Sequence, residues 1–263
     1  MKSVSEIKPE ILKGLSGVFF DIDDTFTTEG KMPEVSFTSL WALHNAGYFV
    51  VPITGRPAGW CDHIARMWPV TGVVGENGAF YFHLDEKRGK LVRRFFIEPD
   101  EIEEKRERLK SIGDKILKEV PGTAYASDQS FRLFDVAIDF TEDVPRLEKE
   151  EIDKICEIFE ENGVTYKVSS IHVNGWFGDY DKLTMTKIFA NEVLNIDLDE
   201  MKGKFVFIGD SPNDEPMFRY FSNSVGVANI KNFLDDIKDP PKFITESTSG
   251  EGFSEVVEII LSK

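Results

Sequence analysis

Short apolar runs alternate with stretches of helical periodicity in the first and last thirds of the chain. The runs at 18–20, 48–53, 72–75, 204–208 and 224–227 predict short strands, because continuous apolar runs of this length are typical of strands buried on both faces. Apolar residues at helical spacing predict helices at 34–47, 60–68, 182–194, 215–221 and 254–261. Strands that alternate with helices in this way predict a parallel sheet covered by helices.

The middle of the chain has a different pattern, which begins near residue 80. Strands at 79–83 and 91–97 are joined by a polar turn and predict an antiparallel hairpin. Amphipathic helices follow at 99–120 and 144–162, with strands at 131–140, 164–169 and 171–177. We therefore expect an α/β fold. Its core would be a doubly wound, Rossmann-like, mostly parallel sheet formed by residues 1–83 and 174–263, with an inserted α+β cap domain at 84–173.

The net charge limits the partners of this protein. The 263 residues carry a formal net charge of −16, which argues against nucleic acid and anionic membranes, since both attract basic surfaces. An anionic substrate would need local attraction from a metal ion, one or two cations, or helix N-termini. The sequence leaves the oligomeric state open.

Cysteine content and hydropathy predict the compartment. The two cysteines, Cys61 and Cys156, give no disulfide framework, so a reducing cytosol is expected. The N-terminal residues lack the apolar segment of a signal peptide, and no apolar run approaches the roughly 20 residues of a membrane-spanning helix. We therefore expect a cytoplasmic location and no membrane partner.

Candidate chemistry begins directly after the first core strand. Asp21, Asp23 and Asp24 follow the apolar run at 18–20, where open α/β sheets bind their ligands. Asp21 and Asp23 would share one face of an extended chain, and two like charges that close need a cation or a shared proton. A hard cation such as Mg²⁺ takes oxygen ligands. A solvated turn or a helix cap explains the acidic residues equally well, whereas a calcium loop would require glycine where Phe26 stands.

Two later strand ends supply further polar groups. Thr54 and Gly55 follow the second core strand, and a threonine hydroxyl with exposed backbone N–H groups suits a phosphate oxygen. The same residues could simply form a turn into a helix. Residues 209–214, Gly-Asp-Ser-Pro-Asn-Asp, follow the strand at 204–208 and add Asp210, Asn213 and Asp214.

These stretches together resemble the haloacid dehalogenase superfamily of phosphotransferases. The family's Asp-x-Asp-x-Thr motif is matched by Asp21, Asp23 and Thr25, its Ser/Thr motif by Thr54, and its acidic motif by Asp210 and Asp214. The large insert, and the Glu-Asn-Gly-Ala segment at 76–79 that leads into it, resemble the type IIB cap of the sugar-phosphatase-like branch.

The resemblance implies a Mg²⁺-dependent phosphatase. Asp21 would be the nucleophile that forms an aspartyl-phosphate, and Asp23 would act as general acid and base. The metal would bind Asp21, the backbone carbonyl of Asp23, and Asp210, with Asp214 nearby. The substrate implied is a small phosphorylated metabolite, foremost a sugar phosphate. The groups expected to hold the phosphoryl oxygens are Thr54, the amide of Gly55, Asn213 and a lysine.

That lysine is either Lys182 or Lys187. Counting back from Gly209 favours Lys187, whereas the apolar register of the helix and the preceding residues 178–181 favour Lys182, which we take as the assignment. Two other functions remain open. A phosphomutase would need a second phosphate-binding cluster in the cap, and a binding module would not need an intact acidic pair at Asp21 and Asp23.

Several other residues have plain structural explanations. His63 and His83 fall in a predicted helix and strand with no acidic partner or metal spacing, and the cysteines suit small buried positions. Trp60 could border the substrate or complete an apolar helix face. His172, Asn174 and Trp176 lie where the cap returns to the core and could contact the leaving group or pack at the junction.

Overall fold

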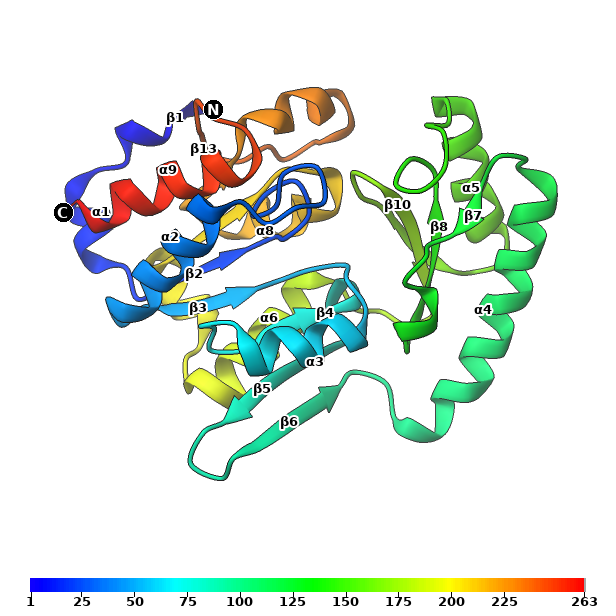
Figure 1. Ribbon diagram of the computed structural model, residues 1–263, viewed down its shortest axis with the longest axis horizontal. Coiled ribbons are helices and arrows are strands. Elements are labelled where there is room, and N and C mark those ends of the chain that lie inside the picture. Colours follow the sequence, from blue (N-terminus) through cyan, green and yellow to red (C-terminus); the bar gives the residue numbers. More distant parts are fainter. Residues whose placement is uncertain (263) are drawn as a thin grey trace.

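The computed structural model describes residues 1–262, which form an α/β core and a cap beside it (Figure 1). The core contains a six-stranded sheet in the order β1-β13-β12-β11-β2-β3, and every neighbouring pair in it is parallel. Its strands are β1 (Lys2–Ser3), β2 (Gly17–Phe20), β3 (Phe49–Pro52), β11 (Phe205–Gly209), β12 (Ser224–Gly226) and β13 (Phe243–Ile244). This parallel sheet confirms the predicted α/β fold class.

The register of the three central strands aligns the predicted motifs. Phe20 at the end of β2 pairs with Ile208 of β11 and with Pro52 of β3. Parallel strands that end at the same level deliver the residues after them to one edge of the sheet. The segments that begin at Asp21, Ile53 and Asp210 therefore start side by side, although they are far apart in the sequence.

Alternation along β2 explains why the sheet is covered on both faces. Val18 and Phe20 belong to one hydrophobic cluster, with residues of α2 (Glu34–Asn45) and α9 (Ser249–Leu261). Phe19 points into the other cluster, with residues of α6 (Lys182–Phe189) and α8 (Glu215–Tyr220). Successive side chains of a strand point to opposite faces, so a continuous apolar run predicts two cores rather than one.

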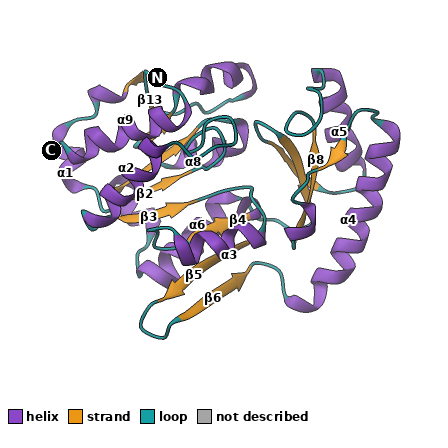
Figure 2. Cartoon of the chain, viewed as in Figure 1, coloured by secondary structure: helices purple, strands orange, loops and turns teal. Residues whose placement is uncertain are grey.

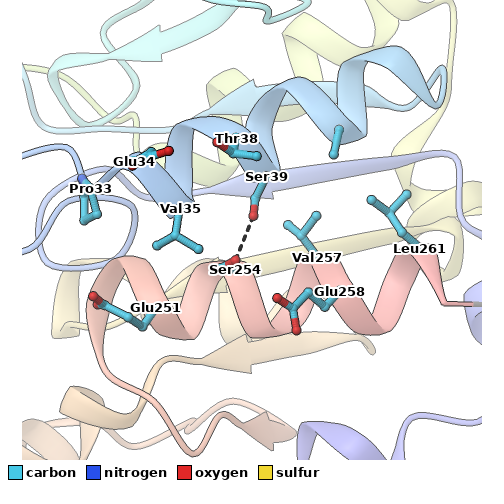
Figure 3. Close-up of a pocket in the computed structure, with 11 residues that line it drawn as sticks. Pro33, Glu34, Val35, Thr38, Ser39, Glu251, Ser254, Val257, Glu258 and Leu261 are labelled. Carbon is cyan, nitrogen blue, oxygen red and sulfur yellow. Dashed lines mark hydrogen bonds between the residues drawn. The ribbon is translucent and has the colours of Figure 1, made fainter.

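Helices α2 and α9 lie side by side on the first of these faces (Figure 3). The hydroxyls of Ser39 and Ser254 are hydrogen-bonded across the two helices at 2.8 Å. Small residues at this crossing allow a close approach. The short helices α1 (Pro9–Gly14) and α7 (Leu198–Met201) and the helix α3 (Ala58–Met67) complete the core.

A three-stranded antiparallel sheet of β4 (Val73–Gly75), β5 (Phe80–Asp85) and β6 (Lys90–Phe95) adjoins the core sheet. A parallel bridge between Ile53 and Val74 links the two sheets. The hairpin predicted from the sequence is thus present. Because β5 pairs with both β4 and β6, the hairpin lies with the core, and we propose that the cap begins after it rather than at residue 84.

The cap consists of a four-stranded antiparallel sheet, β7-β8-β10-β9, and two long helices (Figures 1 and 2). The strands are β7 (Ala124–Tyr125), β8 (Asp135–Asp139), β9 (Thr165–Val168) and β10 (His172–Trp176), and the helices are α4 (Pro99–Glu119) and α5 (Lys149–Glu161). Ile116, Ile155, Phe159 and Val173 are buried among them. This inserted α+β cap also agrees with the expected architecture.

Several boundaries differ from the sequence-based predictions. The C-terminal helix, expected at 254–261, begins at Ser249. The strand expected at 131–140 begins only at Asp135, because Gln129–Phe131 form a 3₁₀ turn. The helix expected at 182–194 changes at Phe189 into a π-helical turn, Ala190–Leu194, which ends at Asn195 with φ of 56°. The helix expected from Val144 begins only at Lys149, where Glu148 and Glu151 form its capping box.

The cysteines and the hydropathy of the helices agree with the sequence analysis. Cys61 and Cys156 are free thiols, both buried, and they pack in the hydrophobic clusters of the core and the cap respectively. Among residues 1–262, no helix has both the length and the apolar character required to cross a membrane.

Gly78 provides a test of how the core is assembled around the start of α6. Its φ is +106°, and an added Cβ would lie 2.0 Å from the carbonyl oxygen of Asp181. Gly89, at the tip of the hairpin, has φ of +61° and open space around it. We expect Gly89→Ala to cost about 1–2 kcal/mol of unfolding free energy from backbone strain alone.

We expect Gly78→Ala to cost about 2 kcal/mol more than Gly89→Ala, because the methyl group must also displace backbone. Urea unfolding of the two variants beside the wild type measures both losses. Equal losses would show that residues 78 and 181 are free to move apart.

Candidate active site

The strand ends bring a set of buried acidic groups together with one lysine. Asp21 follows β2 and is 4% exposed, while Asp210 and Asp214, which follow β11, are fully buried. Lys182, the first residue of α6, is 1% exposed. Its Nζ lies 2.6 Å from Asp21 Oδ1 and 2.7 Å from Asp214 Oδ1. A lysine buried this deeply is rare unless it is paired.

The structure brings Lys182, and not Lys187, to the acidic groups. Asp181 caps α6 by accepting a hydrogen bond from the Thr184 amide at 2.7 Å, which fixes where the helix begins. Lys187 lies farther along the helix, is about one-third exposed, and pairs with Asp199 at 2.7 Å. The geometry therefore favours Lys182 in the choice that the sequence left open.

Asp21, Asp210 and Asp214 form a group of oxygen ligands. One carboxylate oxygen from each lies within 4.8 Å of the others. Asp210 accepts hydrogen bonds from Thr25 Oγ1 at 3.1 Å and from Asn229 Nδ2 at 3.2 Å, and Asp214 Oδ2 accepts from the Asp210 amide at 3.1 Å. These partners hold the oxygens in place from behind, as supporting groups do around metal sites.

The electrostatics of this group favour a divalent cation. Burial raises the pKa of the Asp21 carboxyl to about 8, although Lys182 opposes the shift, and the Asp214 charge adds to it. Burial likewise raises the pKa of Asp210, with the charge of Asp21 as the next cause. The single ammonium group of Lys182 does not neutralise the three carboxylates. The remaining negative charge and the oxygen-only ligand set fit a hard cation such as Mg²⁺.

The Asp23 carboxylate lies outside this group and pairs with an arginine. Arg56 Nε donates to both Asp23 oxygens at 2.9 and 3.0 Å, and its NH2 group donates to Oδ1 at 2.8 Å. The metal ligand expected from Asp23 is its backbone carbonyl, so its carboxylate is not required as a metal ligand. Arg56 also stacks on Trp60, with 4.5 Å from its Cζ to the ring centroid.

Two of the groups expected to hold phosphate, Gly55 and Asn213, line the same cavity as Asp21. Thr54 is fully buried, and its Oγ1 accepts a hydrogen bond from the Arg56 amide at 3.0 Å, which leaves its hydroxyl proton to donate. Asn213 accepts from Ser211 Oγ at 2.9 Å and donates to Asn77 Oδ1 at 3.4 Å. Gly55 packs against Asn77, whose side chain would lie 3.2 Å from an added Cβ.

Arg56 and Arg132 connect the core with the cap. Arg56 NH1 lies 3.2 Å from Asp128 Oδ2, and its NH2 lies 2.8 Å from Glu142 Oε1. Arg132 NH1 donates to the Gly55 carbonyl at 2.9 Å. Glu142 also lies 2.8 Å from His172 Nε2. Burial alone would raise the pKa of the half-buried Glu142 carboxyl. The hydrogen bonds and charges of His172 and Arg56 outweigh burial and lower this pKa to about 2.

Glu76 makes a second connection between these parts. Its carboxylate accepts hydrogen bonds from the amides of Ala58, Leu133, Phe134 and Asp135, at 2.6 to 3.2 Å. Burial raises the pKa of Glu76 to about 8, the Asp135 charge adds to the shift, and Arg132 opposes it. Glu76 thus fixes the start of β8 to the core.

Sequence analysis assigned no role to Arg56, Arg132, Glu142 or Glu76. Glu76 lies inside the quoted segment at 76–79, and Arg56 directly follows Thr54 and Gly55. These positions are the signal that could have identified them. His172 and Asn174 lie in the cavity between core and cap, as the junction position suggested. Trp176 instead is buried and stacks on Tyr180, with 5.6 Å between ring centroids.

The cavity between core and cap is nearly closed. Its volume is about 10 Å³, which is room for roughly one water molecule. Its lining residues are Asp21, Asp23, Gly55, Arg56, Arg132, Ser169, Ser170, Ile171, His172, Asn174, Ser211 and Asn213. A phosphorylated metabolite can enter this cavity only if the cap moves away from the core.

Comparison with known families identifies the class of protein. The chain matches the haloacid dehalogenase-like hydrolase family over residues 18–162 and 147–257 and belongs to that family. This confirms the membership that the motifs predicted.

Curated relatives have modest sequence identity to this chain. A phosphoglycolate phosphatase of Methanobrevibacter smithii is 25% identical over 262 residues, which cover 93% of this chain and 97% of that protein. Phosphoglycolate phosphatase 2 of Saccharolobus solfataricus is 28% identical over 131 residues, which cover 41% of this chain and 55% of that protein.

Solved structures share the fold over nearly the whole chain. A Thermoplasma acidophilum protein superposes with a TM-score of 0.71 at 18% identity, covering 95% of this chain and 99% of that one. The sucrose-phosphatase of Synechocystis, solved with sucrose and phosphate, has a TM-score of 0.64 at 16% identity and covers 94% and 98%. At these identities the likeness concerns the fold.

The two lysines of α6 give a matched pair of variants. Lys182→Ala removes the ammonium between Asp21 and Asp214, so we expect turnover to fall by about 10²-fold or more, the scale for loss of a buried charge-stabilising group. Lys187→Ala removes an exposed ion pair and should change turnover by less than about twofold. Steady-state phosphate release, with circular dichroism as a control of folding, measures both. Comparable activity in the two variants would overturn the assignment.

Proposed function

We propose that this protein is a Mg²⁺-dependent phosphatase that hydrolyses a small phosphorylated metabolite through an aspartyl-phosphate on Asp21. The observation that carries the proposal is the buried carboxylate of Asp21 held 2.6 Å from Lys182 and within 4.8 Å of Asp210 and Asp214. Family membership and the phosphatase names of the curated relatives support the reaction class.

The first half of the reaction transfers the phosphoryl group to the protein. A carboxylate oxygen of Asp21 attacks phosphorus, and the bond from phosphorus to the alcohol oxygen breaks. Asp23 gives its proton to that oxygen as it leaves. Arg56 binds the ionised form of Asp23 in the structure, so this pair must open before Asp23 can carry that proton.

The second half of the reaction returns the protein to its starting state. Asp23, now ionised, takes a proton from a water molecule, which attacks phosphorus and breaks the bond to Asp21. Inorganic phosphate leaves, Asp21 is again a carboxylate and Asp23 is again protonated. Throughout, the Thr54 hydroxyl, the Gly55 amide, Asn213 and the Lys182 ammonium donate to the phosphoryl oxygens, which keeps the transferred group in one orientation.

The residues that would hold Mg²⁺ are Asp21, Asp210, Asp214 and the Asp23 backbone carbonyl. When bound, Mg²⁺ neutralises negative charge between the carboxylates and the phosphoryl oxygens. It also offsets the burial that raises the pKa of Asp21 to about 8, so that more of this nucleophile is ionised at neutral pH. This local charge is how a chain with a net charge of −16 binds an anion.

A phosphatase accounts for the cap better than a phosphomutase does. A mutase needs a second phosphate site, and Arg132 is the buried guanidinium on the cap side of the cavity. Arg132 is already paired with Asp128 at 2.9 Å and with Asp135 at 3.1 Å. These carboxylates cancel the charge that a second phosphate would require.

The substrate class has two candidates. A sugar phosphate is favoured by the type IIB arrangement of the cap and by the shared fold of the Synechocystis sucrose-phosphatase. Phosphoglycolate is favoured by the names of the curated relatives. Of the two, we favour the sugar phosphate, on the arrangement of the cap. We place the reaction in the cytoplasm, in agreement with the free thiols of Cys61 and Cys156.

Asp21→Asn tests the nucleophile. We expect phosphate release with Mg²⁺ to fall by about 10³-fold or more, because an amide oxygen does not form the acyl phosphate. The assay should cover sugar phosphates, nucleotides and phosphoglycerate derivatives as well as phosphoglycolate. Release that survives in the variant would contradict the proposal.

Metal removal tests the ligand set. Excess EDTA should abolish phosphate release, and added Mg²⁺ should restore it, while circular dichroism shows the fold unchanged. Asp210→Asn should raise the Mg²⁺ concentration for half-maximal activity by about 10-fold or more, since it removes one charged ligand. Release that is indifferent to EDTA would exclude a metal-dependent reaction.

A further inference from the structure

Asn229 lies just beyond the end of β12, beside the acidic motif that follows β11. β12 ends at Gly226, and the next amide, that of Val227, donates to the Gly209 carbonyl at 3.0 Å. Parallel strands that end at the same level deliver the residues after them to one edge of the sheet. Asn229 therefore lies next to Asp210, and it has no part in the reaction steps proposed above.

The Asn229 side chain joins three separate segments of the chain. Its Nδ2 donates to the Asp24 carbonyl at 3.0 Å and to Asp210 Oδ2 at 3.2 Å. Its Oδ1 accepts from the Ser249 amide at 3.0 Å, at the start of α9. These partners fix which way the amide faces, because its oxygen meets a donor and its nitrogen meets two acceptors.

The two groups that Nδ2 binds belong to the two halves of the proposed ligand set, one after β2 and one after β11. Asp24 directly follows Asp23, whose backbone carbonyl is an expected ligand, and has a left-handed φ of 54°. Because the peptide between residues 23 and 24 is planar, this φ sets the direction of the Asp23 carbonyl relative to the Asp24 carbonyl. Asn229 thus holds one ligand through the turn after Asp23 and another, Asp210, directly.

The Asp210 carboxylate is held at both of its oxygens. Thr25 Oγ1 donates to Oδ1 at 3.1 Å, and Asn229 Nδ2 donates to Oδ2 at 3.2 Å. A donor on each oxygen fixes the plane of the carboxylate, and so the directions in which its remaining lone pairs point. The ligand set is therefore rigid where Asn229 and Thr25 support it.

A rigid set of ligands discriminates between cations. Mg²⁺ requires a near-ideal octahedron with bonds of about 2.0–2.1 Å, whereas Ca²⁺ accepts bonds of about 2.3–2.6 Å in variable geometry. We propose that Asn229 is a positioning residue that holds the two halves of the ligand set together and makes the site selective for Mg²⁺ over Ca²⁺. This inference rests on the proposed Mg²⁺-dependent phosphatase and deepens it, because it names a residue that sets the choice of metal.

The plain alternative is that Asn229 only caps α9. Thr248, at the N-cap position of α9, makes no side-chain cap hydrogen bond, and Asn229 Oδ1 supplies an acceptor at this helix start. A helix cap, however, needs only the oxygen of the amide. The two hydrogen bonds from Nδ2 go to the segments that carry the metal ligands, and a role in capping does not account for them.

Asn229→Ala is the first test, with metal binding measured apart from activity. The full-length protein is freed of metal with EDTA, and its midpoint of thermal unfolding (Tm) is followed as Mg²⁺ or Ca²⁺ is added, which gives each Kd by linkage. We expect the Kd for Mg²⁺ to rise about 10-fold or more, the scale for loss of a group that supports a metal ligand. The Kd for Ca²⁺ should rise no more than about threefold, because Ca²⁺ tolerates displaced ligands.

Asn223→Ala is the matched control. Asn223 is 3% exposed, and its Nδ2 donates to the Gly203 and Phe205 carbonyls at 2.8 and 3.3 Å, at the opposite end of β11 from Asp210. This variant should lower the Tm of the metal-free protein and leave both Kd values unchanged.

Asn229→Leu is the second variant, since leucine has a similar shape to asparagine and removes the same donors without leaving a gap for water. It should lose Mg²⁺ selectivity in the same direction as Asn229→Ala. The Tm of each metal-free variant, read in the same titrations, shows that it is folded.

The outcomes separate this inference from the proposed function. Equal rises in the Kd for Mg²⁺ and for Ca²⁺ would mean that Asn229 supports the carboxylates without selecting the metal, and would overturn the inference. An unchanged Kd for Mg²⁺ in both Asn229 variants, or the same loss of Mg²⁺ binding in Asn223→Ala, would overturn it too. A wild type whose Tm and phosphate release are both indifferent to Mg²⁺ would refute the proposed function, and the inference with it.

Discussion

The ammonium group of Lys182, held between the carboxylates of Asp21 and Asp214 at 2.6 and 2.7 Å, is the interaction on which the site depends. Carboxylates buried this completely are too costly to keep ionised without a cation nearby. Lys182 supplies one positive charge, and the carboxylates still outnumber it. The same place therefore suits a divalent metal ion and, with that ion, a phosphate. The start of α6 at Asp181, tied to the core through the close contact with Gly78, sets where this charge lies.

Arg56 plays the corresponding part at the boundary with the cap. It pairs with Asp23 in the core and with Asp128 and Glu142 in the cap, so one guanidinium links the position of Asp23 to closure of the cap, beside the connections made by Arg132 and Glu76. Polar interfaces between domains of one chain can separate and rehydrate more readily than apolar ones. A cap held by ion pairs can therefore open for the substrate and close again over the phosphoryl group, with water excluded during the reaction.

The sequence by itself determined the α/β class, the inserted cap and the strand-end motifs, because these are local: an apolar run predicts a buried strand, and the residues after it lie at the strand's end. Tertiary structure decided which charges meet. Lys182 and Lys187 lie on the same helix, but a helix turns by about 100° per residue, so only one faces Asp21. Arg56, Glu142 and Glu76 acquire partners far away in the chain, and no local pattern encodes such pairs. A groove of about 490 Å³ likewise forms only because residues 27–32 and α3 fold against each other and leave Trp60 and Met32 half exposed.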